Sequence, residues 1–200
     1  MKLYYLPGAC SLAAHIAALE AGLPLTLELV SFGADGRTAG GKDYYAINPK
    51  GAVPAAEIDG EILTELAVIL QYIAEQNPTA LPMPSSGMAK WHFLETLNFM
   101  TTEVHKSFAP LFAPGLPDEA KPALLAVGKA KYDLLEQLLT GKEFVSGDSF
   151  TILDAYAFLL IVWISYFGLD LEQWPALKAY KERIGARPSV QKALKQEGLA

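Results

Sequence analysis

Cys10 is the only cysteine among 200 residues, and its thiol is the strongest nucleophile that the chain offers. A Pro-Gly pair separates it from an aromatic segment, residues 3–6, that predicts a strand, and residues 11–21 predict a helix. A thiol at a strand-to-helix turn faces the partial positive charge of the helix N-terminus, which favours the thiolate. These residues alone leave two interpretations equally open, an activated thiol or a small buried cysteine that packs in the turn.

The spacing around Cys10 excludes an internal redox pair. Ala13 occupies the position where the second cysteine of a Cys-x-x-Cys motif would lie. A disulfide cycle within the chain is therefore impossible, and any second sulfur must come from a ligand. A single cysteine also gives no indication of an oxidising compartment.

Two further features lie between residues 51 and 65. Val53-Pro54 precedes a predicted strand, where proline marks a sheet edge or a cis turn, although a trans bond is the commoner case. A cis bond would leave the Val53 backbone open to an extended peptide ligand that adds to the sheet edge. Glu65 stands in the first turn of the next predicted helix, where its carboxylate either compensates the helix dipole or binds a ligand ammonium group.

Composition and charge bound the class of protein. With 52% hydrophobic and 19% charged residues, the chain is expected to be globular, and its net charge of −6 argues against nucleic acid as a partner. The uncharged run 155–169 is shorter than the roughly 20 residues that cross a bilayer, and the N-terminal apolar run is too short for a signal peptide. The three histidines are far apart, and no cluster has metal-ligand spacing. We therefore expect a cytoplasmic protein without a membrane, metal or nucleic-acid partner.

The elements that must position these residues fall into two groups. Residues 1–77 predict the order β-α-β-α-β-β-α, a small mixed sheet with flanking helices in which Asp59-Gly60 forms a hairpin and Thr64 caps a helix to residue 76. Proline and serine in residues 78–87 predict an interdomain linker. Residues 88–200 predict an all-helical domain.

The predicted helical domain contains one long helix over residues 90–108 and a second over 118–139. Thr151 and Asp154 form a capping box in front of an apolar helix that ends near residue 167. Pro175 and Pro188 each begin a further short helix.

Taken together, motifs spread over essentially the whole chain resemble those of the bacterial beta-class glutathione S-transferases. Each motif alone is weak, but the ordered set at matching spacing is specific. The motifs are Tyr4-Tyr5-x-Pro7-Gly8-x-Cys10-Ser11-Leu12, Asn48-Pro49-Lys50-Gly51-x-Val53-Pro54, Leu63-Thr64-Glu65, Leu97-Asn98-Phe99 with Glu103-Val104-His105-Lys106, Gly147-Asp148 with Thr151-x-x-Asp154, and Glu197-Gly198-Leu199.

The resemblance implies a thioredoxin-like N-terminal domain, an all-helical C-terminal domain and a homodimer. It implies transfer of the glutathione thiolate to small hydrophobic electrophiles, with glutathione as co-substrate and catalytic roles for Cys10, Ser11 and His105. The Val53 backbone would pair with the cysteinyl unit of glutathione, and Glu65 with the following residue would receive its γ-glutamyl end. The implied glutathione-binding residues are Tyr5, Cys10, Arg37, Val53, Pro54, Glu65, Leu66, Asn98, Thr102, Glu103, Val104, His105 and Lys106.

The electrophile pocket should be apolar. Its candidates are Phe108, Phe112, Trp163 and Tyr166, although aromatic residues at helical spacing more often form plain core. His105 is likewise either a ligand donor or a core hydrogen bonder, and Lys106 beside it is more often solvated. For His15, four residues after Ser11, we favour a structural role.

Three positions depart from the family pattern. Leu66 replaces the usual Gly or Ser, which leaves only its backbone N–H for the ligand and puts a bulky group beside the γ-glutamyl pocket. The lysine that meets the glycine carboxylate of glutathione has no clear match, and Arg37 is the candidate substitute. Ala14 replaces a common proline in the first helix, which we expect to be structural only.

Two alternatives to conjugation stay open. One is glutathione-dependent disulfide or peroxide reduction through a Cys10–glutathione mixed disulfide. The other is a non-catalytic binding protein on the same fold, which Leu66 and the missing lysine favour.

Overall fold

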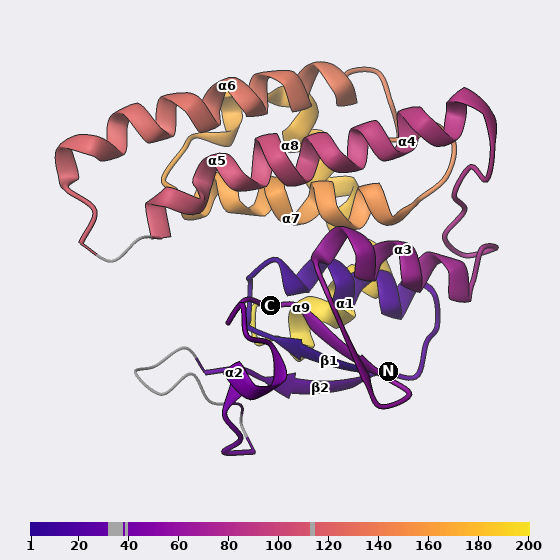
Figure 1. Ribbon diagram of the computed structural model, residues 1–200. Coiled ribbons are helices and arrows are strands. Elements are labelled where there is room, and N and C mark those ends of the chain that lie inside the picture. The colour runs from indigo at the N-terminus through magenta and orange to yellow at the C-terminus, as the bar shows by residue number, and fades with distance from the viewer. Residues whose placement is uncertain (32–37, 39, 113–114) are drawn as a thin grey trace. The chain divides into compact units, whose positions relative to one another are not determined.

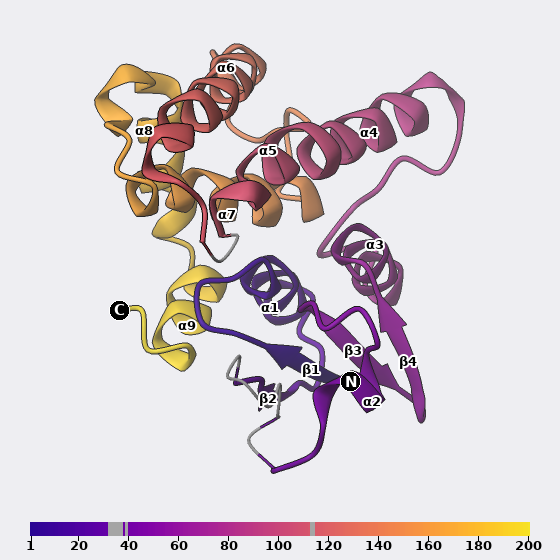
Figure 2. The ribbon, with the colours of Figure 1, turned by 60° about the vertical axis from the view of Figure 1, so that its left-hand side comes forward.

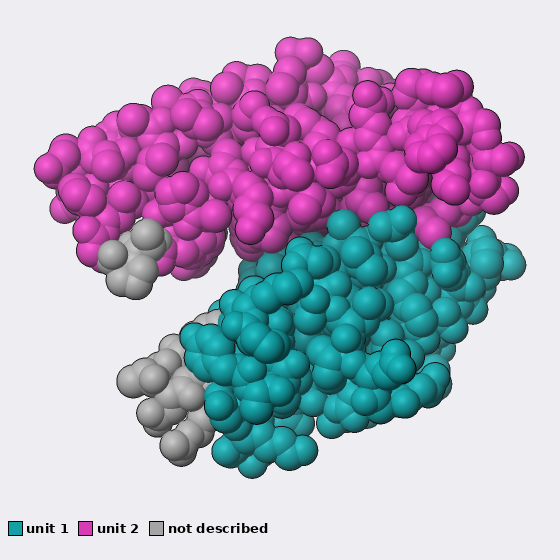
Figure 3. Space-filling view, in the orientation of Figure 1, with its two compact units in different colours: residues 1–82, 186–200 teal, residues 83–185 magenta. Residues whose placement is uncertain are grey.

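The computed structural model describes residues 1–31, 38, 40–112 and 115–200. These residues form two compact units, Met1–Pro82 together with Ala186–Ala200, and Met83–Gly185 (Figure 3). The sequence placed residues 186–200 in the helical domain, whereas in the structure they pack with the first unit. The boundaries at residues 77 and 88 stay a prediction about where the chain divides into independently folding domains.

The first unit contains the mixed sheet that the sequence predicts, and its strand order is β2-β1-β3-β4. The central strand β1 is parallel to β2 and antiparallel to β3, which pairs with β4 in a hairpin. The elements follow one another as β1 (Lys2–Tyr5), α1 (Ser11–Glu20), β2 (Thr26–Leu29), α2 (Tyr44–Ile47), β3 (Ala55–Ile58), β4 (Glu61–Thr64) and α3 (Leu66–Gln76).

Helices α1 and α3 cover one face of this sheet, and α2 lies on the other face (Figure 2). Helix α1 also packs against α9 (Pro188–Gln196), which belongs to the same unit. Eight of its ten residues are buried, because the sheet, α3 and α9 surround it. This explains why the sequence of α1 is rich in alanine and apolar on nearly every side.

The β3–β4 hairpin turns on Asp59 and Gly60, whose φ angles are 51° and 88°. Two consecutive positive φ angles define the type I′ turn that Asp-Gly favours, so the predicted hairpin is confirmed. The predicted cap of the following helix is wrong. Thr64 is the last residue of β4, and Glu65, with a φ of 71°, occupies the N-cap position without a side-chain cap.

The described residues of the second unit form helices that are joined by turns and loops. Figure 1 shows α4, a π-helical segment and α5 as one continuous run alongside α6 and α7. The predicted helix over residues 90–108 therefore exists, but it begins three residues earlier and contains a π segment that the sequence did not indicate. The elements are α4 (Gly87–Phe99), the π segment (Met100–His105), α5 (Lys106–Phe108), the 3-10 turn Ala109–Phe112, the 3-10 turn Asp118–Ala120, α6 (Lys121–Leu139), α7 (Ile152–Tyr166), the 3-10 turn Leu171–Gln173 and α8 (Pro175–Gly185).

The capping box predicted for α7 is confirmed. The Thr151 hydroxyl accepts from the Leu153 N–H, and the Asp154 carboxylate accepts from the Thr151 N–H at 2.7 Å. Asp154 is fully buried and also accepts from Val145 N–H and the Tyr180 hydroxyl. Burial raises the pKa of this carboxyl, and these donors oppose the rise.

Gly128 in the middle of α6 is required by close packing. A Cβ at this position would lie 2.3 Å from Cζ of Phe108, a contact that no real Cβ tolerates. The Phe108 ring cannot move aside easily, because it is fully buried between two other rings. Its centre lies 4.6 Å from that of Phe167, on which it stacks, and 5.0 Å from that of Tyr132. Glycine in a helix interior is about 1 kcal/mol less favourable than alanine. The helix accepts this cost because the Phe108 ring occupies the space that a side chain at position 128 would need.

We predict that Gly128→Ala lowers the free energy of unfolding by about 1–2 kcal/mol, since overpacking outweighs the gain in helix propensity. Chemical denaturation measures this change. In a Phe108→Leu background the ring is gone, and the same substitution should be neutral or stabilising. Equal destabilisation in both backgrounds would contradict the packing explanation.

Candidate active site

Cys10 is the N-cap residue of α1, as the sequence predicts, and its side chain is partly buried. Its Sγ lies 2.9 Å from the carbonyl oxygen of Val53, to which the thiol donates. Only the protonated sulfur can make this hydrogen bond, because a thiolate has no proton to donate and is, like the carbonyl oxygen, an acceptor. The turn therefore joins a thiol, a helix N-terminus and the segment that leads into β3.

Ser11 is fully buried at the first position of α1. Its hydroxyl accepts from the Leu6 N–H and lies 3.2 Å from the Leu6 carbonyl, to which it donates. These bonds tie the end of β1 to the start of α1 and engage the hydroxyl within the turn. This geometry gives Ser11 a structural role in the turn, and its catalytic role stays a prediction.

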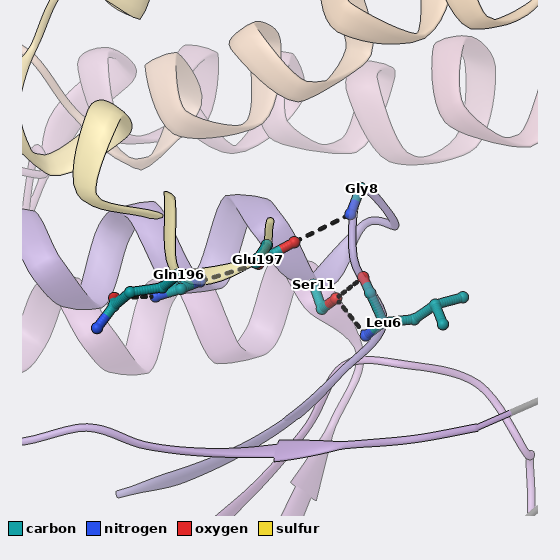
Figure 4. A network of polar contacts seen from close by, with 6 residues as sticks. Leu6, Gly8, Ser11, Gln196 and Glu197 are labelled. Carbon is teal, nitrogen blue, oxygen red and sulfur yellow. Dashed lines mark hydrogen bonds and ion pairs between the residues drawn. The ribbon is translucent and has the colours of Figure 1, made fainter. Parts of the chain in front are cut away.

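The Cys10 turn is anchored by residues from the far end of the sequence. The carboxylate of Glu197 accepts from the Gly8 N–H at 2.9 Å through one oxygen, and its other oxygen lies 2.9 Å from Nδ1 of His15 (Figure 4). His15 is fully buried, and its Nε2 lies 2.9 Å from the side-chain oxygen of Gln196. His15 therefore has the structural role that the sequence analysis favours. We call Gly8, His15, Gln196 and Glu197 the Glu197 network.

We predict that Glu197→Ala lowers the free energy of unfolding by about 2–4 kcal/mol, because it leaves the Gly8 N–H and the His15 ring without their buried acceptor. Glu197→Gln should cost less, since an amide oxygen can serve one of the two groups but not both. Glu75→Ala, at an exposed glutamate on α3, is the control. A loss in Glu197→Ala no larger than in this control would refute the network.

The segment before β3 is held by two side chains that sequence analysis did not select. The Tyr44 hydroxyl and the Asn48 amide both donate to the Ala52 carbonyl, at 2.8 and 2.7 Å. Burial raises the pKa of Tyr44 to about 12, so its hydroxyl keeps the proton that it donates. Asn48 appears in the sequence only as part of a family motif, which does not indicate that its amide is a donor.

The Val53–Pro54 bond that follows is cis, the rarer of the two interpretations of the sequence. Val53 and Pro54 are both buried. The carbonyl of Val53 was expected to be open to a ligand, and in the structure it accepts the Cys10 thiol.

Glu65 and Leu66 lie at the N-terminus of α3. The Glu65 carboxylate makes no cap hydrogen bond and instead pairs with Lys50 Nζ at 2.6 Å, which also donates to Thr64 Oγ1. The Leu66 side chain is 7% exposed and packs into the core, so it does not crowd the γ-glutamyl pocket as expected. Leu66 is the first residue of α3, so its N–H has no acceptor within its own helix and is suited to bind an anion.

The remaining predicted residues of the first unit are Tyr5 and Arg37. Tyr5 is partly buried, with its ring centre 6.5 Å from that of His15. Burial, together with the charge of Glu197, raises the pKa of the Tyr5 hydroxyl. Arg37 lies outside the described residues.

In the second unit, most of the predicted glutathione residues lie in the π segment Met100–His105. A π segment inside an α-helix is often found at a functional site. Asn98, Thr102 and Lys106 are exposed, whereas Val104 is fully buried and cannot touch a ligand with its side chain. The carboxylate of Glu103 is paired with Lys131 Nζ at 2.7 Å.

His105, the last residue of the π segment, is held by two residues of α7. Its Nδ1 lies 2.6 Å from the Tyr156 hydroxyl, and its ring meets the Trp163 ring edge-on with centres 4.9 Å apart. Burial, with the nearby charge of Lys106, lowers the pKa of His105 to about 4. The imidazole is therefore neutral at neutral pH and has one N–H to donate.

We predict that His105 titrates near pH 4 in the folded protein, measured on its ring carbons by NMR. In the unfolded chain a histidine takes up its proton near pH 6.5. Between these values only the unfolded state binds the proton, so the His105 contribution to stability is lost as the pH falls from 6.5 to 4. His105→Gln should make the denaturation profile flatter in this window. A midpoint near 6.5 in the folded protein would contradict the prediction.

The four aromatic residues predicted to line the electrophile pocket differ in their exposure to solvent. Phe112 and Tyr166 are 51% and 71% exposed and stack with ring centres 6.0 Å apart. Trp163 is buried beneath Phe112, and Phe108 is fully buried, so the prediction that Phe108 lines a substrate pocket is wrong. Phe167, which contacts Phe112 at 5.3 Å, completes the cluster and was missed because it ends the apolar helix pattern.

None of the described helices has the length and continuous apolar character that a bilayer crossing requires. Among the described residues, no group of three or more His, Cys, Asp or Glu side chains is placed to bind a metal ion.

The glutathione S-transferase N-terminal domain family matches residues 8–76, and the corresponding C-terminal domain family matches residues 99–188. A glutathione S-transferase, GstA, of Escherichia coli O157:H7 is 42% identical over 201 residues, covering the whole of both chains. The solved structure of a bacterial beta-class glutathione S-transferase from Sphingomonas chungbukensis is 42% identical and covers both chains completely, with a TM-score of 0.95. A sphingomonad glutathione S-transferase solved in complex with glutathione has a TM-score of 0.94, also at 42% identity and full coverage of both chains.

These matches, with a thioredoxin-like sheet domain followed by an all-helical one, show that the chain belongs to the glutathione S-transferase family. Within it, the chain is a bacterial beta-class member and a glutathione transferase enzyme. The predictions of family, fold class and activity are confirmed.

Proposed function

We propose that this transferase binds glutathione along the segment before β3, with the ligand sulfur beside Cys10, and transfers its thiolate to small hydrophobic electrophiles. The observation that carries the proposal is the 2.9 Å contact between Cys10 Sγ and the Val53 carbonyl. It places the thiol and the N-terminus of α1 beside the Val53 backbone, with which we propose that an extended peptide pairs, the ligand displacing the thiol from the Val53 carbonyl.

The γ-glutamyl end of glutathione carries an ammonium and a carboxylate, and the start of α3 offers a partner for each. The Glu65 carboxylate is 62% exposed and takes the ammonium in place of Lys50. The ligand carboxylate accepts from the Leu66 N–H at the positive end of the helix. Lys50, released from Glu65, remains a cation close to both groups.

The thiol of the ligand must lose its proton before it reacts. A thiol with a pKa near 8.5 needs a lowering of about 1–2 units to be largely ionised at neutral pH, and the positive end of α1 favours this ionisation. His105 is proposed to take part in the reaction as a hydrogen-bond donor. The sulfur then bonds to the electrophilic carbon, the leaving group departs with its bonding electrons, and the thiol proton passes to solvent. Phe112 and Tyr166 supply exposed aromatic surface for the electrophile.

We further propose that the enzyme is a cytoplasmic homodimer. Met88 and Trp91 lie three residues apart on α4 and are 63% and 58% exposed. Residues at this spacing share one helix face, and large apolar side chains on a surface favour contact with a second copy. Asn98 and the stretch Thr102-Glu103-Val104-His105 remain proposed glutathione-binding residues of the helical unit.

Calorimetry with glutathione and two activity assays test the proposal together. The wild-type enzyme should bind glutathione at millimolar or lower concentration and conjugate a chlorinated aromatic compound. Cys10→Ala should abolish conjugation if Cys10 activates the ligand thiol. Conjugation that survives in Cys10→Ala while disulfide reduction vanishes would assign Cys10 to the redox alternative. No binding heat at millimolar glutathione would refute the proposed site.

Glu75→Ala serves as the matched control in these assays, because it removes an exposed carboxylate of α3 far along the helix from Glu65. Its binding heat and both activities should equal those of the wild-type enzyme. Glu65→Ala should weaken glutathione binding by about tenfold or more, since it removes the partner of the ligand ammonium.

A further inference from the structure

We propose that Tyr156 is a positioning residue whose hydroxyl donates to Nδ1 of His105 and so holds the proton of the imidazole on Nε2. The inference rests on the proposed function in one respect, that His105 takes part in the transfer reaction as a hydrogen-bond donor. The contact itself is a property of the enzyme without ligand.

Two aromatic residues of α7 contact the imidazole of His105 and hold its ring in one orientation. The Tyr156 hydroxyl approaches Nδ1 at 2.6 Å, and the Tyr156 ring stands at 82° to the imidazole. Trp163 packs edge-on against the same imidazole at 4.9 Å. Tyr156 and Trp163 are seven residues apart on α7, two helical turns, and so present one face to the π segment.

Tyr156 is anchored far more firmly than a surface hydroxyl. Its side chain is fully buried in the middle of α7, where every neighbouring residue of the helix from Ile152 to Ile161 is buried as well. The π segment packs on α7 and contributes His105 as its last residue. A rigid hydroxyl on a buried helix can hold the imidazole of a more exposed segment in one orientation.

The direction of the hydrogen bond follows from the chemistry of the pair. A neutral imidazole has one N–H and one lone pair, and a phenol hydroxyl is the stronger acid of the two groups. Donation from the phenol to Nδ1 leaves the N–H on Nε2. The opposite arrangement would put a lone pair on Nε2, which would repel a thiolate instead of stabilising it.

The tautomer can be read directly by ¹⁵N NMR on enzyme labelled at histidine, without any ligand. The wild-type protein should show the Nε2–H tautomer for His105, and Tyr156→Phe should show a mixture of the two tautomers. Tyr132→Phe is the matched control, because Tyr132 is equally buried in the same unit and donates to the Leu160 carbonyl at 2.7 Å. It should lose stability and leave the tautomer unchanged.

Kinetics then test the role in the reaction. Tyr156→Phe should lower kcat for conjugation about tenfold and leave the KM for glutathione within a factor of two, since the lost effect concerns the thiolate rather than binding. Tyr132→Phe should retain the wild-type kcat. In a His105→Gln background the Tyr156→Phe change should cost no further activity, because both act through one group.

An Nδ1–H tautomer in the wild-type enzyme would overturn the inference whatever the kinetics show. An unchanged tautomer in Tyr156→Phe would overturn it as well. If the tautomer behaves as expected while His105→Gln and Tyr156→Phe both keep the wild-type kcat, the proposed role of His105 in the reaction is wrong. That result would not affect the proposals for Cys10 and Val53, because calorimetry of glutathione binding tests those proposals separately.

Discussion

The buried carboxylate of Glu197 is the interaction on which the arrangement of the thiol turn depends. A charge removed from water is tolerated only when donors surround it, and here they are the Gly8 N–H and the His15 ring. Gly8 belongs to the turn of Cys10, and His15 belongs to the helix that begins there. One side chain therefore fixes both the turn and the helix behind it. The Ser11 hydroxyl completes this fixation from the strand side.

The parts that the sequence predicted correctly are encoded by neighbouring residues. The Asp59-Gly60 hairpin, the Thr151–Asp154 capping box and the element order of the sheet domain all follow from local turn, cap and periodicity rules. The position of Cys10 at a helix N-terminus is likewise local. The family followed from motifs whose spacing is preserved along the chain.

The remaining features are pairings between distant residues, which periodicity does not encode. His15 and Glu197 are 182 positions apart, and His105 and Tyr156 are 51 apart. Leu66 was expected to crowd the ligand because it replaces the usual Gly or Ser of the family, but the helix turns its side chain into the core. Phe108 looked like pocket lining because its spacing matched that of the exposed Phe112. The π segment has no composition signal, since it results from packing between helices rather than from the residues Met100–His105 themselves.

The division of the first unit between two stretches of sequence has a consequence for synthesis. Glu197 leaves the ribosome 189 residues after Gly8, when the whole helical unit between them has already been made. Folding that proceeds from the N-terminus during translation thus forms the sheet before the thiol turn acquires its carboxylate partner. A nascent or prematurely terminated chain carries Cys10 in a turn without this anchor. The anchored turn therefore requires that synthesis has passed Glu197.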